Sequence, residues 1–115
     1  MSDEVRLKPI VFCGSSRKDL LEFPKPAIDD GGYQLFRVQA GDEPDDWKPM
    51  AGGGHGCFEI RISDEGDAFR IIYVAKFTDA VYVLHCFQKK TRKTAQHDID
   101  LAKARYQDLV KELRT

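Results

Sequence analysis

Three apolar runs joined by short turns fill the centre of the chain and restrict the folds that it can adopt. In residues 57–63, apolar and charged side chains alternate, which is typical of a strand with one buried face. Residues 69–76 and 81–87 are denser in apolar side chains, as expected of central strands. Residues 64–67, Asp-Glu-Gly-Asp, are typical of a hairpin turn. Because such short turns join antiparallel neighbours, the sequence predicts a three-stranded antiparallel meander.

The segment before this meander predicts a short strand and two helices. Residues 8–13 are typical of a short first strand, and residues 17–23 of a short helix. Pro26 can occupy the first turn of a second helix. Gly31 and Gly32 lie inside that helix and cost about 1 kcal/mol each relative to alanine, so the pair could instead mark a break in it.

A polar loop and a last helix complete the predicted order. Residues 41–56 are rich in glycine, proline and acidic side chains. Their glycine run precedes a strand rather than a helix, so it lacks the mechanism of a phosphate-binding loop. Residues 94–113 have apolar side chains at helical spacing, with Thr94 as the expected N-cap. Residues 1–115 are therefore predicted to form one α+β domain of order β-α-α-β-β-β-α, an antiparallel sheet with helices packed mainly on one face.

The net charge of −1 is unevenly distributed along the chain. Residues 1–56 contain 7 basic and 10 acidic side chains, whereas residues 85–115 contain 8 basic and 4 acidic ones. An acidic N-terminal half and a basic C-terminal part favour an anionic partner that binds at one place on the protein, rather than a surface that is positively charged throughout.

Composition also sets expectations about location and cofactors. No segment approaches the roughly 20 apolar residues of a membrane span, and the acidic N-terminus lacks the apolar region of a signal peptide. Three widely spaced cysteines, an odd number, argue against a disulfide scaffold and indicate the reducing cytoplasm. Cys-x-x-Cys and His-x-x-x-His spacings are absent, so we expect no metal and no small-molecule cofactor.

A cluster of cations follows the last predicted strand and leads into the last helix. It consists of Lys89, Lys90, Arg92 and Lys93, and Phe87 directly precedes it at the strand end. The cations cannot lie in a core, and RNA is the obvious polyanion for their combined field. Phe87 could stack on a base or pack in the core. The alternative for the whole cluster is a solvated turn.

Two strand arginines extend this pattern. Arg61 and Arg70 lie on strands joined by a tight hairpin, so their side chains can approach each other on the uncovered face of the sheet. Together with the cation cluster they could hold a phosphodiester and stabilise the extra negative charge of a pentacovalent phosphate. Alternatively, they are solubilising residues paired with nearby carboxylates. His97, in the first turn of the last helix, could take a proton near pH 7 or could be an ordinary exposed histidine.

A series of short motifs resembles the phage-derived, HigB-like branch of the RelE/ParE toxin superfamily, over roughly residues 9–113. Each motif alone is weak, but the set is fairly specific. In order, the motifs are Lys48-Pro49-Met50, Gly53-Gly54, Cys57-Phe58-Glu59-Ile60-Arg61-Ile62, Phe69-Arg70-Ile71-Ile72-Tyr73, Val83-Leu84-His85-Cys86-Phe87-Gln88-Lys89-Lys90-Thr91, Lys93-Thr94 and Ile99 with Ala102.

The resemblance implies a RelE-like fold and the toxin of a two-gene toxin–antitoxin module. Such toxins enter the ribosomal A site and cut translated mRNA without a metal, and a helix-turn-helix antitoxin neutralises them. By position, Arg70 matches the arginine that holds the scissile phosphate and Arg61 a supporting basic residue. Lys89 or Lys90 matches the basic residue after the last strand. The remaining basic positions, which are likewise implied to hold RNA backbone, are Lys48 and Lys93.

The acid–base residue near the end of related toxins has only His97 and Tyr106 as candidates in this chain. Two other functions also fit the resemblance. One is a gyrase-inhibiting toxin of the ParE type, and the other is an inactive phage-derived protein that only binds a partner.

Overall fold

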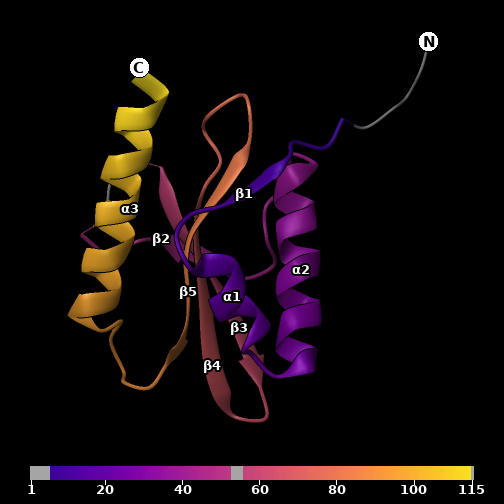
Figure 1. The fold of residues 1–115 in the computed structure, drawn as a ribbon. Helices are drawn as coiled ribbons and strands as arrows, with labels where there is room; N and C mark the ends of the chain where they lie inside the picture. Colours follow the sequence, from indigo (N-terminus) through magenta and orange to yellow (C-terminus); the bar gives the residue numbers. More distant parts are fainter. Residues whose placement is uncertain (1–5, 53–55, 115) are drawn as a thin grey trace.

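The computed structural model describes residues 6–52 and 56–114, and Figure 1 shows their arrangement. Gly53, Gly54 and His55 of the predicted glycine-rich loop lie outside the described residues. The elements in chain order are β1 (Ile10–Phe12), α1 (Ser16–Leu21), α2 (Lys25–Gln39), β2 (Trp47–Pro49), β3 (Cys57–Asp64), β4 (Asp67–Val74), β5 (Val81–Lys89) and α3 (Gln96–Arg114).

The sheet contains five strands in the order β1-β5-β4-β3-β2. The predicted meander of β3, β4 and β5 is antiparallel, as expected. The prediction of an antiparallel sheet is nevertheless wrong as a whole, because β1 pairs with β5 in parallel. The helices α1 and α2 separate β1 from the meander, so no hairpin fixes the direction of β1.

The predicted loop 41–56 contains a strand that sequence patterns did not indicate. Trp47–Pro49 forms β2, which pairs with β3 and places Trp47 opposite Ile60. Three residues are too few to show an alternating pattern, and proline is depleted in strands. Pro49 is tolerated here because β2 is the edge strand.

The helices cover both faces of the sheet, which corrects the expectation that they pack mainly on one. α1 and α2 lie on one side of the sheet and α3 on the other (Figure 1). Successive residues of β4 and β5 belong to two separate cores. Ile71 and Val83 pack in the core on the side of α1 and α2, whereas Ile72 and Leu84 pack in the core on the side of α3. Both faces of these strands are apolar, and each therefore needs a helix.

Gly31 allows α2 to approach the sheet closely. A Cβ atom at this position would lie 2.9 Å from Ile71 Cδ1 and 3.2 Å from Ile62 Cδ1. The neighbouring Gly32 has no heavy atom within 4 Å of the corresponding position. The helix continues through both glycines. Close packing against the sheet explains why Gly31 must lack a side chain, but no contact explains Gly32.

We expect Gly31→Val to destabilise the protein by about 1–3 kcal/mol, because the added methyl groups overpack a core that is already filled. The matched variant Gly32→Ala should stabilise it by about 0.5–1 kcal/mol, because alanine favours an exposed helix position. Urea unfolding measures both changes. Equal effects of the two substitutions would contradict this account of α2.

Candidate anion-binding site

Three predicted site residues form one row across the sheet. The hairpin pairs Asp64 with Asp67, which brings Arg61 directly opposite Arg70. Arg70 in turn lies opposite Phe87 of β5. Side chains directly opposite each other in a sheet share a face, and Phe87 belongs to the core on the α3 side. The hairpin of β3 and β4 extends beyond the first turn of α3, so the helix covers this face only in part (Figure 1).

Arg70 is the most unusual residue of this row. It is only 7% exposed, although it carries a full charge. Its Nη1 donates a hydrogen bond to the carbonyl oxygen of Phe69 at 2.9 Å, and its buried Nε has no hydrogen-bond partner among the described residues. Burial lowers the pKa of Arg70, while the charge of Glu59 opposes this shift and that of Arg61 adds to it. Unsatisfied buried donors are uncommon in native proteins, and Arg37 Nε and His85 Nδ1 are two others among the described residues. Arg70 differs from them because other cations surround it.

Two lysines add to the charge around Arg70. Burial lowers the pKa of Lys89, and the charges of Arg70 and Lys48 lower it further. These cations are therefore close enough to repel one another. An anion placed among them would relieve that repulsion and stabilise the charged forms.

Carboxylates compensate only part of this charge. Arg61 Nε lies 2.9 Å from Asp46 Oδ1, a carboxylate of the loop that precedes β2. Lys48 Nζ lies 3.4 Å from Glu59 Oε2. Four cations, including Arg70 and Lys89, thus share two carboxylates, and the surface keeps an excess of positive charge.

Glu59 attaches the connection between β5 and α3, residues 90–95, to the sheet; this segment is called the cationic connection below. Its side chain is only 1% exposed, and its Oε1 accepts a hydrogen bond of 3.0 Å from the hydroxyl of Thr94. The prediction of Thr94 as the helix N-cap is wrong, because α3 begins at Gln96 and the hydroxyl is used by Glu59. This buried carboxylate acts as an anchor rather than a surface charge.

A second anchor, between His85 and Asp98, was missed by sequence analysis. His85 Nε2 lies 2.7 Å from Asp98 Oδ1, and both side chains are buried. The His85 ring also stacks on the ring of Phe87, with 4.9 Å between centroids. The same Asp98 oxygen lies 3.4 Å from Nε2 of the exposed His97, so one carboxylate is near both histidines but forms its hydrogen bond with His85.

The burial of His85 predicts a pH dependence of stability. Burial lowers the pKa of His85 from its ordinary value of 6.5, although Asp98 opposes the shift. A group with a lowered pKa in the folded state binds protons more readily when unfolded, so stability falls as the pH drops below about 6.5. In the variant His85→Gln, whose amide can still donate to Asp98, we expect the free energy of unfolding to fall less steeply as the pH drops. Urea unfolding between about pH 5 and 7 measures it, and identical slopes in both proteins would contradict the assignment.

The other predicted residues lie around the start of α3. Lys90 and His97 line a pocket of about 500 Å³ together with Phe87 and Lys89. Arg92 and Lys93 are exposed on the same connection. The second acid–base candidate, Tyr106, lies elsewhere, because its hydroxyl accepts a hydrogen bond of 2.8 Å from Lys76 Nζ.

The described residues include no group of three or more His, Cys, Asp or Glu side chains that could hold a metal ion. Within the same residues, no helix is both long and apolar enough to span a membrane.

The fold and this surface define a small α+β protein with a five-stranded mixed sheet, three helices and a cationic patch on one sheet face. The chain belongs to the family described as phage derived protein Gp49-like (DUF891), which matches residues 18–107. This is a RelE-like, toxin-like family. No curated protein matches the chain.

Proposed function

We propose that this protein is a HigB-like toxin of a type II toxin–antitoxin module and cuts translated mRNA on the ribosome without a metal. The observation that carries the proposal is Arg70, a buried guanidinium whose Nε has no partner among the described residues. A buried charge is costly when it is only partly compensated, and a phosphate bound beside the guanidinium would add the opposite charge. Membership of the Gp49-like family supports the same conclusion.

The reaction needs charge stabilisation and two proton transfers. The ribose 2′-hydroxyl gives its proton to a water molecule of the solvent and attacks the neighbouring phosphorus, so the 2′-O–P bond forms. The P–O5′ bond then breaks, the departing 5′-oxygen takes up a proton, and the products are a 2′,3′-cyclic phosphate and a 5′-hydroxyl. Negative charge accumulates on the phosphate oxygens in the transition state, where preorganised donors act most strongly.

Each residue of the site has a role in this scheme. Arg70 donates to the scissile phosphate, and Arg61 supports it from the neighbouring strand. Lys90 and Lys89 border the pocket beside Phe87 and stabilise the developing charge. His97, whose Nε2 lies 3.4 Å from Asp98 Oδ1, delivers the proton to the 5′-oxygen in its protonated form.

The exposed cations would hold the RNA backbone beyond the scissile bond. Arg92 and Lys93 lie on the connection before α3, and Lys48 lies on the edge strand. Phe87 is only 8% exposed and its ring stacks on that of His85, so little of it is available for a base to stack on. A helix-turn-helix antitoxin that covers this surface would neutralise the toxin by keeping it off the ribosome and its mRNA.

In vitro translation followed by primer extension tests the proposal. Addition of the purified chain should stop protein synthesis and produce new 5′ ends within the translated part of the message. Cleavage should require ribosomes, so the same message incubated with the chain in the absence of ribosomes should stay intact. Intact messages together with inhibited DNA supercoiling would instead identify a gyrase inhibitor, and the absence of both effects would leave a binding protein.

A further inference from the structure

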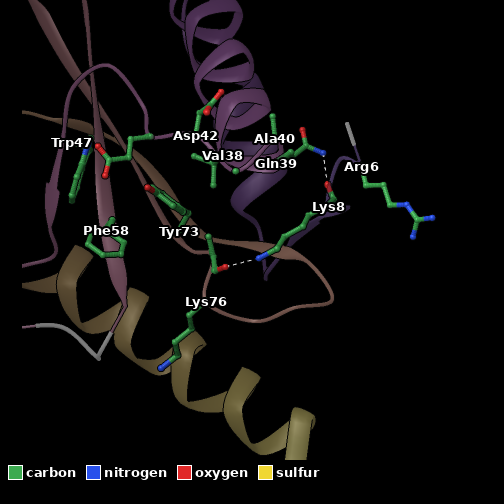
Figure 2. Close-up of a pocket in the computed structure, with 13 residues that line it drawn as sticks. Arg6, Lys8, Val38, Gln39, Ala40, Asp42, Trp47, Phe58, Tyr73 and Lys76 are labelled. Carbon is green, nitrogen blue, oxygen red and sulfur yellow. Dashed lines mark hydrogen bonds between the residues drawn. The ribbon is translucent and has the colours of Figure 1, made fainter. Parts of the chain in front are cut away.

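A second pocket lies on the opposite face of the sheet from the cationic site. It occupies about 440 Å³ between the end of α2, the edge strand β2 and the strands β3 and β4. This volume is within the range of ligand pockets, roughly 300–1,000 Å³. Figure 2 shows Trp47, Phe58 and Tyr73 along one wall, Asp42 near the end of α2, and Lys8 entering from the other side.

The wall of this pocket is a continuous run of aromatic rings. The rings of Trp47 and Phe58 are 5.1 Å apart between centroids and nearly perpendicular, at 86°, whereas those of Phe58 and Tyr73 are 6.0 Å apart and tilted by 37°. A flat ligand can therefore stack on the face of one of these rings and meet the edge of its neighbour. Trp47 and Phe58 are both only half-buried, so part of their π surface faces the pocket. Flat aromatic ligands such as nucleobases bind to surfaces of this kind.

Two carboxylates lie at the aromatic end. Asp42 and Glu43 line the pocket, are exposed, and form no ion pair with any other described residue. The charge of Glu43 contributes, after burial, to raising the pKa of Tyr73 to about 12, which places that carboxylate near the ring. Ionised carboxylates only accept hydrogen bonds, and they pair well with the amino groups of bases.

The other end of the pocket is cationic. Lys8 Nζ donates hydrogen bonds of 2.7 Å to the carbonyl oxygens of Ala75 and Phe77. Neutral carbonyl oxygens fix the ammonium group but do not cancel its charge, and one of its three N–H donors remains. Arg6 lines the same end. A basic peptide side chain would fit the carboxylates but would be repelled here, whereas a phosphate would be attracted.

We propose that this pocket binds a nucleotide whose base carries an exocyclic amino group, with the base stacked on the ring of Trp47 or Phe58 and its phosphate toward Lys8. The base amino group would donate to Asp42 or Glu43. The ligand is either a free nucleotide or a nucleotide of an RNA strand, since both present the same base and phosphate. This site is independent of Arg70 and of the proposed cleavage.

Trp47 is the only tryptophan of the chain, so its fluorescence reports directly on this pocket. Titration of the full chain with AMP or CMP should give a saturable change, and UMP, which lacks the amino group, should bind at least about fivefold more weakly. A three-nucleotide RNA forms the second arm. Binding of AMP as tight as that of the RNA would identify free nucleotides as the ligand, and tighter binding of the RNA would identify the strand.

Variants complete the test. Asp42→Ala combined with Glu43→Ala, at two exposed positions, should remove the preference for AMP over UMP without unfolding the protein. Arg70→Ala should leave the fluorescence titration unchanged even if it ends toxicity. The proposal is overturned if no nucleotide gives a saturable change up to about 10 mM, if UMP equals AMP, or if arginine amide binds and nucleotides do not.

Discussion

Arg70→Ala is expected to reduce mRNA cleavage by at least about 100-fold, because it removes the donors that hold the phosphate in the transition state. Growth arrest on expression should disappear with it. The fold should persist with some loss of stability, because Arg70 Nε forms no hydrogen bond with a described residue, but alanine leaves a cavity beside buried Glu59. Primer extension after in vitro translation measures the cleavage, and thermal unfolding measures the stability.

Two further variants separate the role of Arg70 from a general loss of charge. Arg17→Ala removes an exposed arginine from α1, on the other side of the sheet, and should leave cleavage unchanged. Arg70→Lys keeps the charge but loses the planar fork, and should recover only a small part of the activity. A folded Arg70→Ala protein that cleaves at the normal rate would remove Arg70 from the mechanism.

The fold could be predicted from the sequence where local patterns decide it. Alternation in β3 and the turn before β4 determine the hairpin, and both were recognised. The strand β2 could not be predicted, because three residues carry no period and its pairing depends on β3. The placement of α3 on the opposite face (Figure 1) could not be predicted either. It follows from contacts between distant segments, because the strands β4 and β5 contribute side chains to two cores.

The site was predictable to a similar extent. Arg61 and Arg70 follow from the hairpin register, and the lysines follow from their position after β5. The anchors behind them are contacts between distant elements. Glu59 meets Thr94 across 35 positions, and no sequence spacing indicates such a pair. His85 looked like an ordinary sheet residue because its partner lies in another element, in the first turn of α3.

Asp98→Ala is expected to have the second-largest effect, because Asp98 anchors the cationic connection and contacts both His85 and His97. Leaving buried His85 without its partner should cost about 1–3 kcal/mol of the free energy of unfolding. Cleavage should fall by at least about tenfold even well below the unfolding temperature, because small displacements of catalytic groups are costly.

The matched control for Asp98→Ala is Asp100→Ala, which removes an exposed carboxylate from the same helix end, bonded only to Gln96 at 2.9 Å. It should change stability by no more than about 0.5 kcal/mol and leave cleavage intact. Asp98→Asn, which keeps an acceptor for His85, should retain more stability than Asp98→Ala. A double-mutant cycle with His85→Ala should give a coupling energy of about 0.5–3 kcal/mol. Additive effects in that cycle would mean that the contact between β5 and α3 does not hold the connection, and the site would then depend on Glu59 and Thr94 alone.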